Sequence, residues 1–84
     1  MKKKTESIDV NNHIISIYRN VFDDSNTPES DILKVEISEL ESLNFIRLIF
    51  VIQDELEVNL TISEINQTKT LKHLAVLILE KIRS

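Results

Sequence analysis

Ser42 is the residue whose position most favours chemistry, because it lies where a long aperiodic stretch meets a strongly amphipathic one. A hydroxyl at the start of a helix lies near unpaired backbone N–H groups and the positive end of the helix dipole, so an anionic group attached there is stabilised. Serine is also a preferred N-cap residue, whose loss typically costs about 1 kcal/mol. Position alone therefore favours a plain N-cap over a modified serine.

The other polar groups give no pattern of a catalytic or metal site. His13 and His73 each lie in a predicted helix, with no second histidine or cysteine at ligand spacing, so we expect solvated or packed side chains. Two carboxylate pairs, Asp23-Asp24 and Glu39 with Glu41, are explained by a turn and by helix capping. Nothing indicates a cleft that would separate their pKa values as acid–base catalysis requires. We expect no enzyme, no catalytic residue and no metal ligand.

Composition argues against several classes of partner. Acidic residues outnumber basic ones 14 to 10, and most basic residues lie near the two ends of the chain. No positive stripe is available to neutralise a phosphate backbone, so we do not expect a nucleic-acid partner. The absence of cysteine excludes disulfides and thiolate metal sites, and it suits a cytoplasmic protein.

Glycine is also absent, which excludes the glycine-rich phosphate loops of the Walker and Rossmann kinds. The longest apolar run, Leu74–Leu79, is far shorter than the roughly 20 residues that a membrane-spanning helix needs. The basic start Met1–Lys4 is not followed by the apolar core of a signal peptide. We expect a cytoplasmic monomer without membrane contact, consisting of a single domain over residues 1–84 whose residues 1–6 form a flexible tail.

Helical periodicity marks the elements that would position Ser42. A first amphipathic helix is predicted from about Ile8 to Phe22, and it ends at the turn-forming segment Asp23–Asn26. The stretch from Asp23 to about Leu40 contains the only proline, Pro28, and lacks a sustained period, so we predict a long loop there. Apolar residues within this stretch are expected to pin the loop to the core: Ile32, Leu33, Val35, Ile37 and Leu40.

The second long helix, from about Ser42 to Glu57, carries two apolar stripes. Phe45, Leu48, Ile49, Ile52 and Leu56 have ordinary core spacing and are expected to face inward. A second stripe lies roughly opposite, near three charged residues; its members are Leu43, Ile46 and Phe50, and the charged residues are Arg47, Asp54 and Glu57. This second stripe is either a docking surface or is covered by the long loop or a short helix, and the sequence leaves both alternatives open.

Two further helices complete the predicted fold. A capping-box pattern, Thr61–Glu64, predicts a short helix from Thr61 to Asn66, and core spacing predicts a last helix from about Thr70 to Arg83. The fold class is therefore all-α: a small four-helix bundle with three long helices, one short helix and a long loop between the first and second.

The segment Glu41–Ile46, which enters a helix after a long loop, resembles the Asp-Ser-Leu-Asp-Phe-Ile type segment of acyl carrier proteins. The order of predicted elements is similar to that family over nearly the whole chain, and Thr68–Leu74 resembles the start of its last helix. The resemblance implies a bundle of the acyl-carrier type. It also implies that Ser42 carries covalent 4'-phosphopantetheine, with Glu41 and Leu43 beside the attachment site.

The function that the resemblance implies is that of a carrier domain. A phosphopantetheinyl transferase would load Ser42, and the thiol of the arm would hold an acyl or aminoacyl group as a thioester. The partners would be an acyl- or aminoacyl-loading ligase and downstream synthases of a specialised fatty-acid, polyketide or nonribosomal-peptide type pathway. The second stripe and its charges would bind these partners or shelter a bound chain.

The chain departs from the family pattern at several positions. Glu41 replaces the usual aspartate, and no glycine precedes the motif. Asn44, Arg47 and Gln53 stand where the family commonly has carboxylates, so different partners are implied. The alternative is a helical protein-interaction or regulatory module in which Ser42 is only a helix cap. A degenerate carrier that has lost loading is a further alternative.

Overall fold

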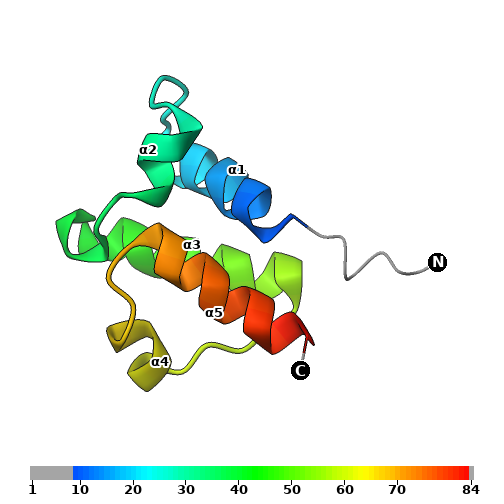
Figure 1. The fold of residues 1–84 in the computed structure, drawn as a ribbon. Helices are drawn as coiled ribbons and strands as arrows, with labels where there is room; N and C mark the ends of the chain where they lie inside the picture. The colour runs from blue at the N-terminus through cyan, green and yellow to red at the C-terminus, as the bar shows by residue number, and fades with distance from the viewer. Residues whose placement is uncertain (1–8, 84) are drawn as a thin grey trace.

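The computed structural model describes residues 9–83, and in this range the chain is all-helical without a named strand. Long helices make up the body of the fold, and short helices lie in the connections between them (Figure 1). The elements in chain order are α1 (Val10–Phe22), α2 (Glu29–Leu33), the 3₁₀ turn η2 (Ile37–Glu39), α3 (Ser42–Leu56), α4 (Ile62–Asn66) and α5 (Leu71–Arg83). The all-α prediction is confirmed, whereas the predicted tail 1–6 lies outside the described residues.

The three long helices begin and end within one or two residues of their predicted bounds. The N-cap of α1 is Asp9, whose Oδ1 accepts a hydrogen bond from the backbone N–H of Asn12 (3.1 Å). The helix ends where Asp23 takes a left-handed conformation. The capping box predicted for α4 is present, since Thr61 Oγ1 accepts from the Glu64 N–H and Glu64 Oε1 accepts from the Thr61 N–H. Local sequence signals therefore fix these helix ends.

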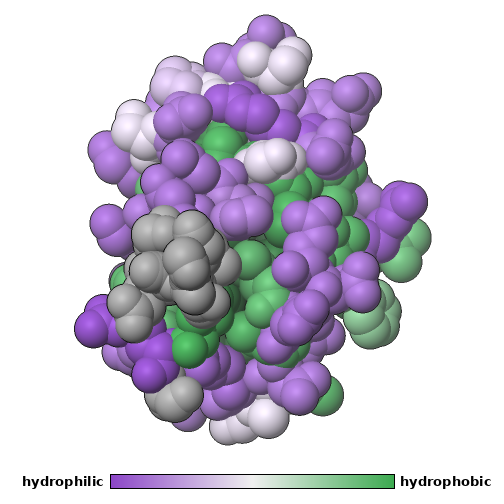
Figure 2. Space-filling view, turned by 90° about the vertical axis from the view of Figure 1, so that its right-hand side faces the viewer, coloured by the Kyte–Doolittle hydropathy of each residue, from purple (hydrophilic) through white to green (hydrophobic). Residues whose placement is uncertain are grey.

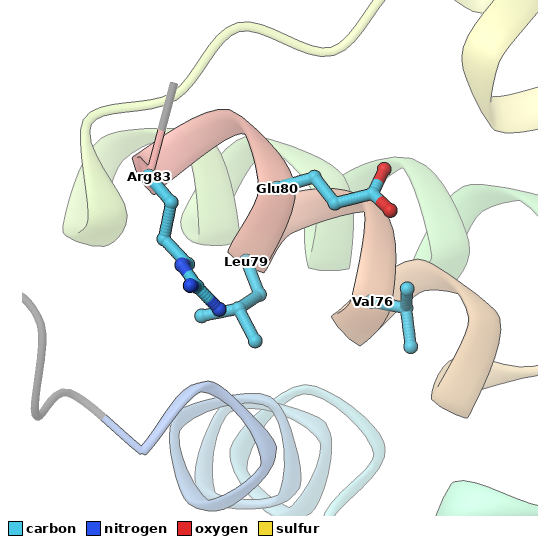
Figure 3. Close-up of a pocket in the computed structure, with 4 residues that line it drawn as sticks. All are labelled: Val76, Leu79, Glu80 and Arg83. Atoms are coloured by element: carbon cyan, nitrogen blue, oxygen red, sulfur yellow. The ribbon is translucent and has the colours of Figure 1, made fainter.

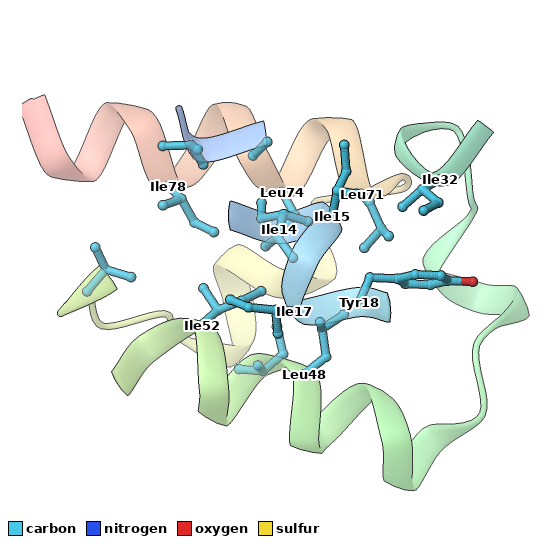
Figure 4. Close-up of a cluster of buried hydrophobic side chains, with 14 residues drawn as sticks. Ile14, Ile15, Ile17, Tyr18, Ile32, Leu48, Ile52, Leu71, Leu74 and Ile78 are labelled. Carbon is cyan, nitrogen blue, oxygen red and sulfur yellow. The ribbon is translucent and has the colours of Figure 1, made fainter. Parts of the chain in front are cut away.

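The core lies where α1 packs against both α3 and α5 (Figure 4). The predicted inward stripe of α3 is confirmed, because Leu48 and Ile52 are fully buried and Ile49 nearly so. Seven large aliphatic side chains are fully buried: Ile14, Ile32, Leu48, Ile52, Leu71, Leu74 and Ile78. Burial of branched aliphatic side chains at these positions supplies the main stabilisation of the bundle.

One prediction needs correction, because the stretch between α1 and α3 is not simply a loop. Glu29–Leu33 forms the short helix α2, and Ile37–Glu39 forms η2. Pro28 occupies the N-cap position of α2, and Glu29 and Asp31 place negative charge in the first turn, where the helix dipole favours it. Ile32 is fully buried against the core, which confirms that this stretch is pinned. The bundle therefore has five α-helices in residues 9–83 rather than four.

Two non-glycine residues adopt the left-handed backbone conformation at the ends of the long helices. Asp23 closes α1 with φ 52°, and Glu57 closes α3 with φ 55°. Glycine is the usual residue at such positions because a Cβ atom is unfavourable there, and aspartate tolerates the conformation better than glutamate. In a chain without glycine, Glu57 is therefore the more strained of the two.

We expect Glu57→Gly to stabilise the protein. Relief of left-handed strain contributes about 1–2 kcal/mol, and the greater unfolded-state entropy of glycine offsets about 0.4–1 kcal/mol, so the net gain is about 0.5–1 kcal/mol. Urea unfolding followed by circular dichroism measures this gain. The control is Glu55→Gly in the body of α3, which should lose about 1 kcal/mol; a loss in both variants would contradict the strain at Glu57.

The turn after α1 is organised by the Asp24 carboxylate. Its Oδ1 accepts from the backbone N–H groups of Asn26 and Thr27 (both 3.0 Å), and its Oδ2 accepts from the Thr27 hydroxyl (2.7 Å). These hydrogen bonds, first that of the Thr27 side chain, favour the charged form and lower the pKa of Asp24 below its ordinary value of 3.8. The turn that connects α1 to α2 therefore depends on an ionised carboxylate.

The contribution of Asp24 to stability is expected to disappear in acid. A carboxylate whose folded-state pKa is lowered stabilises the fold above its ordinary pKa of 3.8, and this stabilisation is lost as the pH falls through the lowered value. The wild type should therefore resist urea better than Asp24→Ala at about pH 7, and the gap between their midpoints should shrink below about pH 3. A gap of the same size at both pH values would show that ionisation of Asp24 plays no part.

Hydrophobic side chains reach the surface on the face of the molecule shown in Figure 2. Figure 2 shows the face that carries the described ends of the chain, where hydrophobic side chains form a band between hydrophilic ones. Leu79 and Ile82, near the end of α5, are only partly buried while they pack against the core. The hydrophobic core therefore reaches the surface at this end.

Candidate functional site

The candidate site begins with the residue that caps α3, which is Glu41 and not Ser42. Glu41 has extended backbone angles, and its Oε1 accepts a hydrogen bond from the backbone N–H of Asn44 (3.0 Å). The Glu41 carbonyl accepts the first helical hydrogen bond, from the N–H of Phe45 (2.9 Å). The interpretation of Ser42 as the N-cap is thus wrong: the longer glutamate side chain reaches back over the first turn and takes this role.

Ser42 is the first residue of α3 and its side chain is exposed. The capping of the first turn by Glu41 leaves the Ser42 hydroxyl unused for that purpose. The first-turn N–H groups and the dipole of the 15-residue helix favour negative charge at this end of α3, where the Glu41 carboxylate already accepts from the Asn44 N–H. An exposed nucleophile in this setting can accept a phosphoryl group, and the resulting negative charge is stabilised where it forms.

The segment before Ser42 is held against the start of α5. Glu36 and Thr70 form an isolated antiparallel bridge. On either side of this bridge the Ile37 N–H donates to the Lys69 carbonyl (2.8 Å) and the Leu71 N–H donates to the Val35 carbonyl (3.1 Å). Residues 69–71, at the start of α5, therefore fix the position of the backbone that leads toward Ser42.

The second apolar stripe of α3 is exposed among the described residues, so the long connection and the short helix do not bury it. The exposed fractions of Leu43, Ile46 and Phe50 are 62%, 49% and 65%, so neither the preceding segment nor α4 covers them. Arg47 and Asp54 are exposed as well, as is Glu57 directly after the helix. At 100° per residue these six positions share one side of α3, and we call this side the α3 face.

An apolar cavity of about 210 Å³ opens between α3 and α4. Six hydrophobic side chains line it: Phe45, Ile46, Ile49 and Phe50 from α3, and Ile62 and Ile65 from α4. Phe45 and Ile46 follow Ser42 by about one helical turn, which corresponds to roughly 5 Å along the axis. The cavity can therefore accept an aliphatic group but offers no hydrogen-bonding side chain to a polar one.

The side of this cavity that α4 forms was not predicted from the sequence. Ile62 is the most exposed large hydrophobic residue described, at 77%, and Ile65 lies one turn further on. Their spacing of three residues on a short capped helix is the signal that could have identified them. The structural role of Gln53 was also not predicted. Its Oε1 accepts from the Leu60 N–H (2.8 Å) and so attaches α3 to the connection that leads into α4.

A second hollow, of about 480 Å³, lies along α5 and is lined by Val76, Leu79, Glu80 and Arg83 (Figure 3). The Arg83 side chain runs beside that of Leu79, whereas the Glu80 carboxylate points away from both. All four residues belong to one helix, and they include neither a nucleophile nor a histidine. This hollow therefore has no arrangement for acid–base or covalent chemistry.

The histidines are not brought together. His13 is exposed on α1, and His73 Nδ1 accepts from the backbone N–H of Lys69 (3.3 Å) at the start of α5. Among residues 9–83 no group of three or more metal-ligating side chains is arranged around a common point. No helix in the described part of the chain has the length and hydrophobicity that are needed to cross a membrane.

The fold and the site define a small all-helical domain with an exposed serine at the head of its longest described helix, beside an apolar cavity. Comparisons with protein-family models, with curated proteins and with solved structures found no match to this chain.

Proposed function

We propose that this protein is an acyl carrier protein that holds acyl or aminoacyl groups as thioesters on a 4'-phosphopantetheine arm attached to Ser42. The observation that carries the proposal is that the two residues at the start of α3 differ in role: Glu41 caps the helix, and the Ser42 side chain remains exposed. A serine that served only as a cap would direct its hydroxyl to the backbone. Here that role belongs to the preceding residue.

The loading step follows from the position of the hydroxyl. A phosphopantetheinyl transferase would direct Ser42 Oγ at the diphosphate of coenzyme A, on the phosphorus that bears the pantetheine arm. A new O–P bond forms, the bond between the two phosphates breaks, adenosine 3',5'-bisphosphate leaves, and the serine proton passes to a base of the transferase. The phosphodiester keeps its negative charge at the positive end of the α3 dipole, where that charge is stabilised.

The proposed carrier has no catalytic residue of its own. Its arm supplies a thiol, which this cysteine-free chain lacks, and the tether raises the effective concentration of the cargo at a partner's active site. The apolar cavity begins about one turn from Ser42, so an aliphatic cargo on the arm could enter it and be removed from water. The proposed bundle is of the acyl-carrier type, with α2 and η2 in the connection that leads to the serine.

The α3 face is the proposed docking surface for the transferase, the loading ligase and downstream synthases. Leu43, Ile46 and Phe50 offer apolar contact area, while Arg47 and Asp54 can fix the orientation of a partner. The face carries one positive charge, Arg47, and two negative charges, Asp54 and Glu57, rather than a purely acidic strip, which favours partners with a mixed complement of charges.

Intact-protein mass spectrometry tests the proposal. The chain is incubated with coenzyme A, magnesium and a broad-specificity phosphopantetheinyl transferase, and the wild type is compared with Ser42→Ala. Gain of one phosphopantetheine by the wild type alone supports the carrier, and failure of the wild type to gain it overturns the proposal if a known carrier is loaded in parallel.

A second candidate function is a protein-interaction module, favoured by the three exposed apolar side chains of the α3 face. In this case two copies of the chain, or the chain and another protein, would bury Leu43, Ile46 and Phe50. Sedimentation at increasing concentration would then show association that Phe50→Ala weakens. A monomer at all concentrations, together with loading of Ser42, favours the carrier instead.

A further inference from the structure

The exposed large hydrophobic side chains of residues 9–83 gather around one helix. All of them except Val76 on α5 lie on α3 or at the start of α4. Ile46, Phe50 and Ile62 border the same apolar cavity, and Leu43 lies one turn before Ile46 on the α3 face. A contiguous exposed apolar patch is typical of an interaction surface. Within the described part of the chain, the α3 face is therefore the surface best suited to bind another molecule.

Two charges flank the centre of this patch. Arg47 and Asp54 are both exposed, and within residues 9–83 neither forms an ion pair with another side chain. Phe50 lies between them, three residues after Arg47 and four residues before Asp54. Seven residues make almost two full helical turns, so both charges lie on the same side of α3 as Phe50, about 10 Å apart along the axis. The patch thus has a positive end and a negative end on either side of an apolar centre.

This charge pattern restricts the partner. A uniformly acidic helix would be attracted by Arg47 but repelled by Asp54 and Glu57, and a uniformly basic helix would be repelled by Arg47. The complementary helix carries a carboxylate and a cation about two turns apart, with an apolar residue between them. Helix α3 has this pattern itself, in the required order when it runs in the opposite direction.

Antiparallel packing of two α3 helices satisfies every charge at the centre of the patch. If the two-fold axis passes midway between Arg47 and Asp54, Arg47 of each copy lies opposite Asp54 of the other, and the two Phe50 side chains meet at the centre. Each charge is then about 5 Å from the centre along the axis, so the opposite charges stay within reach at the usual helix crossing angles. Parallel packing would place like charges opposite each other. The two-fold arrangement uses the same patch on both copies and therefore closes at two.

We infer that the α3 face binds a second copy of this chain, in an antiparallel two-fold dimer held by two Arg47–Asp54 ion pairs around Phe50. The contact involves one helix from each copy and so belongs to the low end of interface sizes. We expect a dissociation constant of about 0.1–1 mM, and therefore a monomer at micromolar concentrations.

The dimer is compatible with loading of Ser42 on the monomer. In the proposed carrier it would cover the docking surface of the concentrated chain until a partner displaces the second copy. Only this consequence rests on the proposed function, because the pairing itself follows from the residues of α3.

Sedimentation equilibrium of the full, unloaded chain tests the dimer, with Arg47 and Asp54 reversed singly and together. Arg47→Asp and Asp54→Arg each replace two attractive pairs by two repulsive ones, so either variant should raise the dissociation constant about tenfold or more. The double variant restores both pairs in reverse, and its constant should return to within about twofold of the wild type. Both side chains are exposed, so circular dichroism should show the same fold in all variants.

The matched control is Glu55→Arg. Glu55 is exposed and follows Asp54 directly, but it is turned by 100° around α3 and lies off the α3 face. Glu55→Arg and Asp54→Arg change the net charge of −4 by the same amount. Relief of general repulsion between acidic chains would strengthen association in both variants, whereas the proposed pairing predicts that only Asp54→Arg weakens it.

Three results would overturn the dimer. A wild type that is still monomeric at about 2 mM excludes it. Equal effects of Asp54→Arg and Glu55→Arg would show that only the net charge matters. A double variant that fails to recover would show that Arg47 and Asp54 do not face each other. No transferase is present in these experiments, so their failure would leave the proposed loading of Ser42 untouched.

Discussion

Ser42→Ala is expected to abolish loading completely, because in the proposed reaction the Ser42 oxygen forms the new bond to phosphorus. The wild type should gain the mass of one phosphopantetheine, and the variant should gain none at any transferase concentration. The fold should be unaffected, since Glu41 caps α3 and the exposed Ser42 side chain makes no contribution to the core. Far-ultraviolet circular dichroism and a urea midpoint check this second part.

The matched control for this experiment is Ser38→Ala. Ser38 is also exposed and lies in η2, four residues before Ser42, but it is not at the head of a helix of more than one turn. Loading should continue normally in this variant. Loading that persists in Ser42→Ala and disappears in Ser38→Ala would place the attachment elsewhere and remove the argument from the α3 dipole.

The second prediction with a large expected effect concerns stability, which should depend on the buried side of α3 and hardly on its exposed side. Leu48→Ala should destabilise the protein by about 2–5 kcal/mol, because the Leu48 side chain is fully buried and its removal leaves a cavity in the core. That loss is a large part of the roughly 5–15 kcal/mol that holds a typical small protein folded. A fall in melting temperature of about 4–8 °C per kcal/mol follows for a domain of this size.

Phe50→Ala is the comparison for Leu48→Ala, two residues further along the same helix. Phe50 is 65% exposed, so its truncation should change stability by only about 0.5 kcal/mol. Thermal unfolding of both variants in the same buffer measures the contrast. Similar losses would mean that the α3 face is covered in solution, which is the outcome expected if it forms an interface between two copies of the chain.

The long helices were predictable because their apolar residues repeat over several turns. In α3 the inward stripe contains Leu48 and Ile52, and both are fully buried as their spacing predicts. Helix α2 was not predictable in the same way, because five residues contain only one fully buried side chain, Ile32, and a single residue defines no period. Its helical state depends on the packing of Ile32 in the core, and this packing cannot be recognised from the neighbouring residues in the sequence.

The candidate site was predicted in part. Its exposed apolar residues on α3 could be chosen from the sequence, but whether they were covered could not, since coverage depends on where α4 lies. A plain N-cap was one interpretation of Ser42, because serine is preferred at that position and glutamate is not. The structure gives the cap to Glu41, whose longer side chain reaches the Asn44 N–H. The cavity needs residues from two helices: the spacing of Ile62 and Ile65 could have indicated one wall, but no local pattern predicts how that wall meets α3.

If Ser42 is loaded as proposed, the backbone pairing of Glu36 with Thr70 would also affect when loading can occur during synthesis. The residues that orient the approach to Ser42 come from the start of α5, so a ribosome-bound chain that ends before Thr70 has the serine but lacks the backbone that holds it in place. A transferase that recognises the folded site would therefore act only after the C-terminal helix has emerged and docked. In that case only chains in which α5 has been synthesised and has docked would be loaded, and truncated chains would remain without the phosphopantetheine arm.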